Sequence, residues 1–457
     1  GSFPSSSAER VLDAQGAFVF PGIIDAHGGD ALHAGILDDP TQGDFLLQGV
    51  TTVIGGHGGR SLAPLSLHAR AAEESLGARR RINADWRSVK EFFSTLSRTS
   101  RGVHFGTLIG GETILKVLSR RGVSRSGESE LVAECAAALA SGALGLSSRS
   151  ATPSSTAPLL DALAHAGGGV LATECGVARS LRSRISQTLA AAERTAGARL
   201  VLSGLRRAMR ALRDRQRASL LSLFTASATP FAYFDLSPHD ASLLSIRELL
   251  PEKIAGLSES ALLAALRREP IVRSIREEIS SDGRSVGEFS VLSSHHAPFF
   301  EGRTIGEIAR DREVSSGEAF VDLLALSRGE AELLVPDISS DELTALLAHP
   351  SALVGSFGAS LTAAHASFRA FTRSSFPLFF RRLRALLPLE TAVSKVTLLP
   401  ARVYGIPDRG CIAPRMVADL AVFRDGEAIH TVVSGAVAVE NGELTAARGG
   451  RPILRHV

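Results

Sequence analysis

The sequence predicts an α/β protein whose core is a parallel sheet closed into a (β/α)8 barrel, followed by a smaller antiparallel β region. Short apolar runs alternate with helical patterns along most of the chain, which is typical of βα units. The apolar run Ile23-Ile24 leads directly into polar residues, and barrels of this class build their sites from loops at the carboxyl ends of strands. From Ala418 to Val457, apolar and polar residues alternate between Gly turns, which predicts antiparallel strands.

The individual elements follow from runs of β-branched residues and from helical periodicity. The segment Val50-Thr51-Thr52-Val53-Ile54 is typical of a buried parallel strand. Expected strands are 11–20, 50–54, 143–148, 169–173, 199–203, 290–294 and 353–356, and expected helices are 41–48, 86–98, 127–141, 156–166 and 181–195. Residues 240–290 have less strand character and are expected to form a helical insertion beyond the barrel core. The basic segment 206–217 is interpreted as a solvated helix face.

The composition excludes several classes of function. The 457 residues are 44% hydrophobic and 21% charged, as in globular proteins, and the net charge is only +3. Arginine dominates the basic residues, since lysine occurs only at positions 90, 116, 253 and 395, so no nucleic-acid partner is expected. No apolar run approaches the roughly 20 residues needed to cross a bilayer, so no membrane association is expected either.

Cysteine usage indicates a reducing compartment. Cys135, Cys175 and Cys411 are too few and too scattered for a disulfide framework or a thiolate zinc site. A cytoplasmic or other reducing location is therefore expected. No secretory signal is visible, but Gly1-Ser2 resembles a cloning remnant, so a missing targeting segment stays open.

Several motifs resemble those of the N-acyl-D-amino-acid deacylases (D-aminoacylases) of the amidohydrolase superfamily, from about Gly16 to Arg455. The motifs are Pro21-Gly22-Ile23-Ile24-Asp25-Ala26-His27, Gln48-Gly49-Val50-Thr51-Thr52-Val53, Ser61-Leu62-Ala63-Pro64, Ser141-Gly142-Ala143-Leu144-Gly145-Leu146-Ser147, Gly302-Arg303-Thr304-Ile305-Gly306-Glu307-Ile308-Ala309, Val354-Gly355-Ser356-Phe357-Gly358, Thr397-Leu398-Leu399-Pro400-Ala401, Asp408-Arg409-Gly410 and Ala418-Asp419-Leu420-Ala421-Val422-Phe423. The resemblance implies a barrel over residues 21–400 and a small β-sandwich formed by residues 1–20 and 401–457. That sandwich is expected to be incomplete, because family members usually have more strands before the position of Val11.

The resemblance also implies a metal site, and this chain departs from it. Hydrolysis of an amide at neutral pH uses a metal to activate water and a carboxylate to move protons. The family supplies a His-x-His, a cysteine, two later histidines and a late aspartate. At these positions the chain has, in order, His27, Gly29, Gly58, Glu174, Gly204 and Phe357. Only His27 keeps the family residue and only Glu174 is a possible replacement ligand, so we expect a degenerate metal site and no bound cofactor.

Three further positions of the expected pocket have changed as well. Gly111 stands where the family has a histidine, Thr152 where it has a tyrosine, and Ser367 where it has the arginine that clamps the substrate carboxylate. We therefore expect the pocket at the barrel mouth to be lined by His27, Gly29, His57, Gly58, Thr152, Gly204 and Phe357.

Several alternatives remain open at the level of sequence. His27, His57 and Glu174 are the candidates for one residual zinc ion. Asp30 and Glu174 are candidate acids or bases for metal-free catalysis, whereas Asp25 is expected to support the turn after its strand.

Other reactive residues are weaker candidates. Cys175 with His27 is a minor alternative as a nucleophilic pair. His295-His296 is expected on the surface, and the loop Gly55 to Gly59 is a weak phosphate-binding signal.

These observations favour a pseudoenzyme, an amidohydrolase-fold protein kept for binding or assembly. The alternative is an enzyme of hydrolase or lyase type, metal-independent or with a single metal, that uses a rebuilt pocket for a small molecule at the barrel mouth. A third hypothesis is that a protein partner or a second copy completes the β-sandwich at its open edge.

Overall fold

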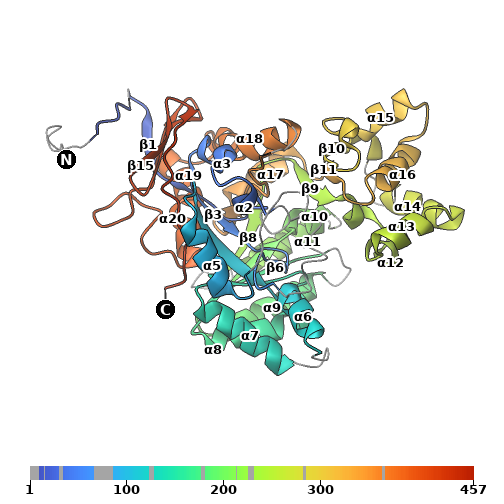
Figure 1. Cartoon of the computed structure of the whole chain (residues 1–457), viewed down its shortest axis with the longest axis horizontal. Coiled ribbons are helices and arrows are strands. Elements are labelled where there is room, and N and C mark those ends of the chain that lie inside the picture. Colours follow the sequence, from blue (N-terminus) through green and yellow to red (C-terminus); the bar gives the residue numbers. More distant parts are fainter. Residues whose placement is uncertain are drawn as a thin grey trace.

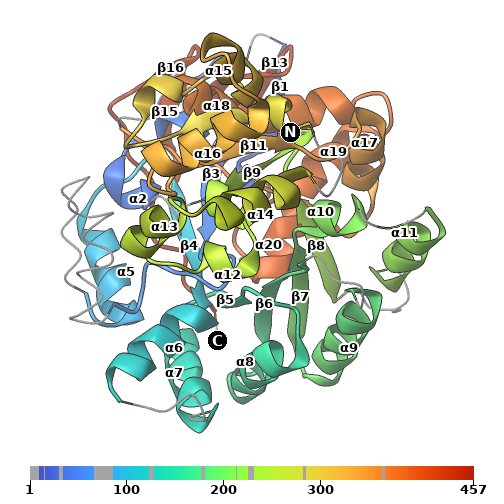
Figure 2. The same ribbon diagram turned by 90° about the vertical axis from the view of Figure 1, so that its right-hand side faces the viewer.

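The computed structural model describes residues 10–14, 16–29, 34–65, 86–122, 128–176, 181–210, 212, 214–224, 231–280, 285–362 and 366–456. Eight parallel strands form the barrel sheet in the order β12-β8-β7-β6-β5-β4-β3-β2. Figure 2 shows β3 to β8 of this sheet. The eight strands are β2 (Ile23–Asp25), β3 (Val50–Gly55), β4 (His104–Gly110), β5 (Gly145–Ser148), β6 (Gly169–Glu174), β7 (Ala198–Ser203), β8 (Ala232–Leu236) and β12 (Ala352–Val354). The predicted barrel is confirmed.

Two of these strands were not predicted from the sequence. β4 contains Gly106, Thr107 and Gly110, which lack the bulk that marks a buried strand. In β8 the carboxylate of Asp235 interrupts a short apolar run. Conversely, the predicted strand at 290–294 is β10 (Ser290–Ser293), which lies in a different sheet and not in the barrel.

Helices follow the barrel strands and cover the outer side of the sheet (Figure 2). They are α3 (Gly43–Leu46), α5 (Val89–Arg98), α6 (Gly111–Arg120), α7 (Glu128–Ala140), α8 (Pro153–His165), α9 (Leu181–Arg194), α10 (Leu205–Arg210), α11 (Asp214–Leu221), α17 (Ser340–Ala348), α18 (Ala366–Leu383) and α19 (Leu389–Val396). A further helix, α20 (Leu398–Tyr404), packs instead against the apolar residues inside the barrel. One apolar cluster fills the layer between strands and helices, and a second fills the inside of the barrel. None of the helices in the described ranges has the length and apolar character needed to span a bilayer.

An insertion lies between β8 and α17, at the opposite end of the molecule from the small sheet (Figure 1). Besides the expected helices it has a three-stranded antiparallel sheet in the order β10-β11-β9, with β9 (Ala241–Ser245) and β11 (Glu332–Pro336). Its helices are α12 (Glu252–Ala255), α13 (Glu259–Ala265), α14 (Glu269–Ser280), α15 (Ile305–Asp311) and α16 (Ser316–Leu326). The insertion has an apolar core of its own.

The two ends of the chain form a five-stranded antiparallel sheet in the order β1-β13-β14-β15-β16. Its strands are β1 (Phe18–Pro21), β13 (Leu420–Arg424), β14 (Glu427–Val433), β15 (Ala436–Glu440) and β16 (Glu443–Leu444). Within the described ranges this is one layer, where the sequence led us to expect a sandwich. The rings of Phe20, Phe423 and Phe380 of α18 pack together, so the second layer is the barrel with its helices.

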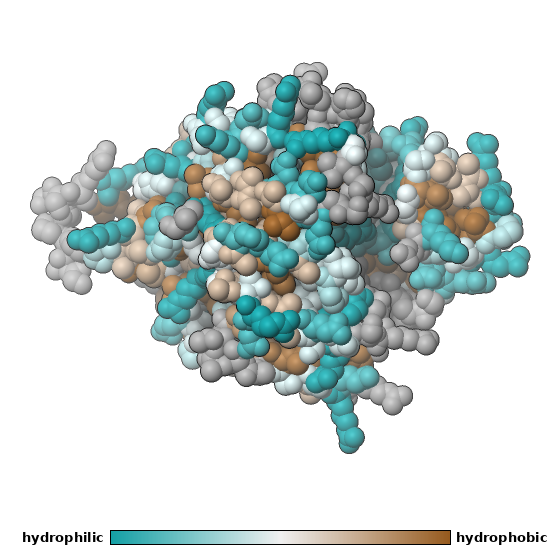
Figure 3. Space-filling view, turned by 90° about the horizontal axis from the view of Figure 1, so that it is seen from below, coloured by the Kyte–Doolittle hydropathy of each residue, from teal (hydrophilic) through white to brown (hydrophobic). Residues whose placement is uncertain are grey.

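In the view of Figure 3, hydrophilic and hydrophobic residues are interspersed over the barrel body, and a separate hydrophobic group lies at the end occupied by the insertion.

The barrel closes between its first and last strands through backbone hydrogen bonds. The amide of Ala26 donates to the carbonyl of Val354 (3.1 Å), that of Phe357 to His27 (2.9 Å), and that of Gly29 to Gly358 (2.7 Å).

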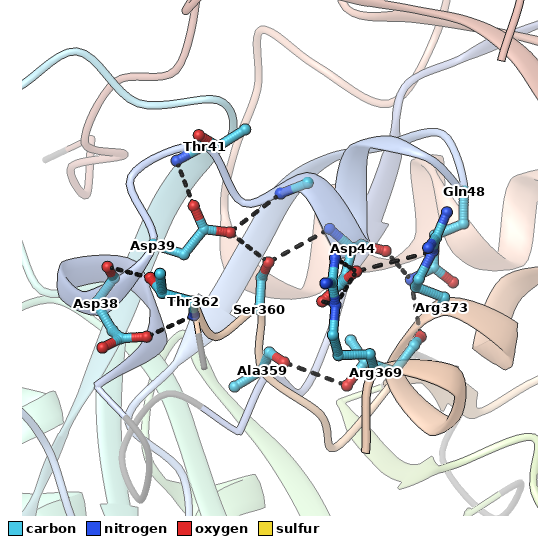
Figure 4. A network of polar contacts seen from close by, with 12 residues as sticks. Asp38, Asp39, Thr41, Asp44, Gln48, Ala359, Ser360, Thr362, Arg369 and Arg373 are labelled. Atoms are coloured by element: carbon cyan, nitrogen blue, oxygen red, sulfur yellow. Dashed lines mark hydrogen bonds and ion pairs between the residues drawn. The ribbon is translucent and has the colours of Figure 1, made fainter. Parts of the chain in front are cut away.

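A polar network on the outside reinforces this closure (Figure 4). The buried carboxylate of Asp44 accepts hydrogen bonds from Arg369 Nε and Nη2 (3.1–3.3 Å), and Arg373 lies 3.7 Å away. The Ser360 hydroxyl donates to Asp39 (2.6 Å), which ties the segment after β12 to the segment after β2.

We predict that Asp44→Asn lowers the free energy of unfolding by about 2 kcal/mol, because it leaves two arginines without their buried counter-charge. Urea unfolding measures the change. The matched control is Glu134→Gln, which breaks the exposed pair with Arg121 (54% and 36% side-chain exposure) and should change stability by less than about 0.5 kcal/mol. Equal effects of the two substitutions would contradict the role of Asp44.

Lys395 of α19 provides a prediction about pH. Its Nζ donates to the carbonyl of His349 at the end of α17 (2.6 Å), and burial lowers the pKa of the ammonium to about 8. Between pH 8 and the ordinary lysine range, the unfolded chain therefore binds more protons than the folded one, so stability rises with pH. Relative to Lys395→Met, the wild-type protein should gain up to about 3 kcal/mol from pH 7 to pH 10.5. The free energy of unfolding of both proteins is measured with urea at each pH. If it changes with pH by the same amount in both, the prediction is wrong.

Candidate functional site at the barrel mouth

The candidate site lies where the barrel strands end. His27 follows β2, His57 follows β3, Asp235 lies near the end of β8, and Phe357 follows β12. The two histidines and Asp235 are buried, and one potential ligand atom of each lies within 4.8 Å of the others. The structure thus brings together His27 and His57, as the sequence predicted, but with Asp235 in place of Glu174.

His27 is the centre of this group. Its Nδ1 lies 2.8 Å from Asp235 Oδ2. Its ring stacks on that of His57, with centroids 3.8 Å apart and planes 15° apart. It also stacks on the ring of Phe357, with centroids 3.9 Å apart and planes 25° apart. Burial lowers the pKa of His27, but the charge and hydrogen bond of Asp235, with a further contribution from Glu174, outweigh it and leave that pKa raised.

His57 has the opposite electrostatic character. Burial, followed by the neighbouring His27, lowers its pKa well below the ordinary histidine value, so its imidazole is neutral. Neither ring nitrogen makes a hydrogen bond of good geometry to the described residues, although a contact with the Ala26 backbone opposes the lowering of the pKa. Tyr404 lies edge-on to it at 6.4 Å and donates its hydroxyl to the Ala26 carbonyl from inside the barrel.

Two buried carboxylates hold the backbone and the His27 side chain in place. Asp25 accepts from the amides of His27 and Ser356 (3.0 Å each) and from the Ser356 hydroxyl (2.5 Å). Burial raises the pKa of Asp25 despite these bonds. Asp235 Oδ2 also accepts from Ser203 Oγ (2.6 Å), whereas its Oδ1 has no partner in the described part of the chain. The expected turn-supporting role of Asp25 agrees with these contacts.

Gly29, the position of the second family histidine, lies against the backbone after β12. A Cβ at residue 29 would stand 2.8 Å from the Phe357 carbonyl oxygen and 3.1 Å from that of Gly358. Such separations are shorter than ordinary van der Waals contacts. With this backbone, no side chain larger than hydrogen fits at residue 29.

The other altered positions face the mouth without adding a ligand to this group. Gly58, at φ +63°, would direct a Cβ toward Glu174 Oε1, 3.8 Å away. Glu174 ends β6, is half-buried, and acts on His27 through its charge. Gly204 begins the turn after β7 at φ +73°, a conformation that favours glycine.

The remaining candidates make other contacts. Thr152 is the N-cap of α8, and its hydroxyl lies 2.8 Å from that of Ser155. Cys175 is buried in the layer between strands and outer helices, which argues against a nucleophilic pair with His27. His295 and His296 belong to the insertion, where His296 pairs with Glu330 (3.3 Å). Asp30 lies outside the described residues.

Two further altered positions are helical. Gly111 begins α6, and Ser367 lies in the first turn of α18.

The residues of this group have suitable donor atoms for a metal, but the geometry of the two histidine rings opposes shared coordination. Two imidazoles and a carboxylate are suitable donors, and His57 and Asp235 carry unpartnered buried atoms. However, nitrogen lone pairs lie in the ring planes, and here those planes are stacked nearly parallel. One ion about 2 Å from both nitrogens cannot lie in both planes. As arranged, the two imidazoles cannot bind one ion together.

Asp235 is the site residue that sequence reasoning missed. The available signal was a single carboxylate inside the apolar run Tyr233-Phe234-Asp235-Leu236. A buried acid in such a run needs a partner, and here the partners are His27 and Ser203.

Comparison with known proteins agrees with the motifs. No protein-family model matches the chain. An N-acyl-D-glutamate deacylase of Alcaligenes xylosoxydans xylosoxydans is 28% identical over 440 residues, covering 93% of this chain and 80% of that protein. A solved structure of a D-aminoacylase superposes with a TM-score of 0.72 at 23% identity, covering 100% of this chain and 93% of the other. That structure is described as addressing the functional role of the binuclear metal centre, with one-metal activation and second-metal attenuation.

An N-acyl-D-glutamate deacylase from Bordetella bronchiseptica, in complex with zinc and a phosphonate inhibitor, also superposes with a TM-score of 0.72 at 23% identity, covering 97% of this chain and 90% of the other. The chain is therefore a homologue of the D-aminoacylases and N-acyl-D-glutamate deacylases, and it has the D-aminoacylase type of amidohydrolase fold.

Proposed function

We propose that this protein is a pseudoenzyme that does not hydrolyse N-acyl-D-amino acids and that serves binding or assembly. The observation that carries the proposal is the contact at Gly29, where the backbone after β12 occupies the space of a side chain. A second family histidine cannot return there without moving the barrel closure. The backbone around the mouth has therefore adapted to glycine at residue 29, which is a larger change than the replacement of one ligand side chain.

The chemistry of the neighbouring residues supports the same proposal. Phe357 stands in place of the proton-handling aspartate and covers one face of His27. An apolar ring neither accepts a proton nor orients water, and each such lost contribution typically costs a factor of about 100 or more in rate. The positive charge of His27 is instead balanced by the carboxylate of Asp235, a contact that needs no metal.

A second candidate function is an enzyme with a single metal. The closeness of His27, His57 and Asp235 favours it, together with the unpartnered nitrogens of His57. A turn of the His57 ring out of the stack would be required before both histidines address one ion.

We expect the purified protein, dialysed against zinc and then against buffer, to retain far less than one zinc per chain by elemental analysis. We also expect no hydrolysis of N-acetyl-D-glutamate or N-acetyl-D-aspartate above the buffer blank, with a zinc-dependent N-acyl-D-glutamate deacylase as the positive control. The reason is that the stacked rings offer no common coordination point.

Variants decide between the two candidates. If one zinc per chain binds and is lost in His57→Gln, but not in His296→Gln of the insertion, the pseudoenzyme proposal fails and the single-metal enzyme is supported. Hydrolysis that is insensitive to chelators and lost in His57→Gln would instead support a metal-independent site.

The assembly part of the proposal concerns the edge strand β1. It pairs with β13 on one side, and no described strand pairs with its other side. Phe18 and Val19 are 60% and 47% exposed, which is unusual for adjacent apolar residues on an open edge. We propose that a strand from a protein partner or a second copy pairs here.

Light scattering coupled to size exclusion should then find a species larger than one chain. Val19→Lys should shift it to the monomer, because a lysine on an edge strand opposes further pairing. Leu326→Lys, at an equally exposed position on α16 (43%), is the control and should leave the size unchanged. A monomeric wild-type protein that captures no partner would exclude this role.

A further inference from the structure

A cavity of about 550 Å³ is lined by residues of α10, α11 and α17 and by the segment 336–339, which leads from the insertion into α17. Its volume falls within the roughly 300–1,000 Å³ that is typical of small-molecule sites. None of its lining residues belongs to the group around His27. The cavity is therefore a separate feature, and an inference about it does not depend on the function proposed for the barrel mouth.

Much of the cavity wall is apolar. The apolar side chains are those of Met209, Leu221, Pro336, Ile338, Ala345 and Leu346. Met209 and Leu346 are themselves buried, so the interior of the protein borders directly on the cavity. An apolar molecule that covers such a wall removes apolar surface from water, which favours binding.

Two charged residues of the wall offer a ligand almost no surface. The side chains of Arg206 and Asp337 are 7% and 3% exposed. Arg206 donates to carbonyls of the loop 237–241, and Asp337 accepts from the Ser242 hydroxyl, so their hydrogen bonds are made with residues outside the cavity wall. The second carboxylate oxygen of Asp337 is buried as well. Neither residue is accessible enough to bind a charged head group.

The accessible charges of the wall form a pair with each other. The side chains of Arg217 and Glu342 are 28% and 46% exposed, and Arg217 Nη1 donates to Glu342 Oε1. The other oxygen of Glu342 accepts from the Ser339 hydroxyl (3.0 Å), and Arg217 Nε donates to two backbone carbonyls. A charged ligand would have to separate this pair or lose its hydration without gaining a counter-charge, and both cost free energy.

His349, the remaining titratable residue of the wall, adds no charge at neutral pH. Its Nδ1 accepts from the Ser351 amide (3.1 Å). Burial, followed by the charge of Lys395, lowers the pKa of the imidazole below the ordinary histidine value, so the ring is neutral. The two arginines and the two carboxylates of the wall cancel, which leaves no net charge for an ion to complement.

We propose that this cavity binds an uncharged, compact apolar molecule, of the size of a substituted aromatic ring or a branched hydrocarbon of similar bulk. The apolar side chains hold the ligand, and the paired charges of the wall discriminate against ions of either sign.

The first test uses three probes with one fluorinated ring: 4-fluorotoluene, 4-fluorobenzoate and 4-fluorobenzylamine. Fluorine NMR titrations with the full-length protein should find binding of fluorotoluene, with an affinity that hardly changes with salt. The two ions should bind at least about tenfold more weakly, because the wall offers neither of them a free counter-charge. Tighter binding of the benzoate would assign the site to anions, and tighter binding of the amine would assign it to cations. Either result overturns the proposal.

Hydrogen exchange in the wild-type protein locates the site. With fluorotoluene bound, the amides of residues 337–346 should exchange more slowly, because the ligand opposes local opening of the segment that lines the cavity. Helix α15 of the insertion lies outside the cavity wall, so its exchange is the internal reference and should not change. Binding without protection of residues 337–346 would place the probe elsewhere and contradict the proposal.

Filling the cavity is the third test. Ala345 is exposed on α17 and lines the cavity, so Ala345→Trp should abolish binding of fluorotoluene while circular dichroism stays unchanged. The matched control is Ala190→Trp, at an exposed position of α9 away from the cavity, which should bind like the wild type. Undiminished binding in Ala345→Trp, or no binding of fluorotoluene to the wild-type protein, would each overturn the proposal. If Ala345→Trp does not fold, the exchange experiment on the wild-type protein decides.

Discussion

The close approach of the backbone after β2 to the backbone after β12 is the constraint on which the candidate site depends. Gly29 and Phe357 each donate an amide hydrogen across this junction, and Asp25 holds both sides through His27 and Ser356. A buried carboxylate with three donors is costly to expose, so this junction is rigid. Its position fixes where His27 and Phe357 stand, and hence how the mouth is filled.

Burial and the neighbouring charges set the electrostatics of the mouth. Asp235 stabilises the charged form of His27, and burial, with a further contribution from His27, lowers the pKa of His57. Two stacked imidazoles of which one is charged avoid the repulsion that two charged rings would have. Phe357 covers the remaining face of His27 and reduces the water that reaches it. The mouth is therefore held together by contacts among its own residues, with the acid and the histidine as mutual counter-charges.

The barrel could be predicted because strands such as β3 and β7 are short runs of β-branched and aliphatic residues, as the packing of a buried parallel sheet requires. It missed β4 and β8, since Gly106, Thr107 and Asp235 break that pattern and are accommodated only by neighbouring strands. At the mouth, His27 and His57 follow their strands directly and were predictable as neighbours. Asp235 was not, because no local pattern distinguishes an inward-facing carboxylate of β8 from one on its outer side. Glu174 lies on the correct strand end, but it does not belong to the group around His27.

Arg206 is a buried cation whose charge interacts with several carboxylates around it. Burial lowers the pKa of its guanidinium, and the charges of Asp337, Asp240 and Asp235 oppose that effect. Arg206 lies 3.6 Å from Asp337 and fixes the loop 237–242 through four hydrogen bonds. Because the donors of Arg206 are committed to that loop, neither Asp235 nor Asp337 is fully neutralised by it. Asp235 completes its balance with His27, whereas Asp337 Oδ1 has no equivalent partner within the described chain.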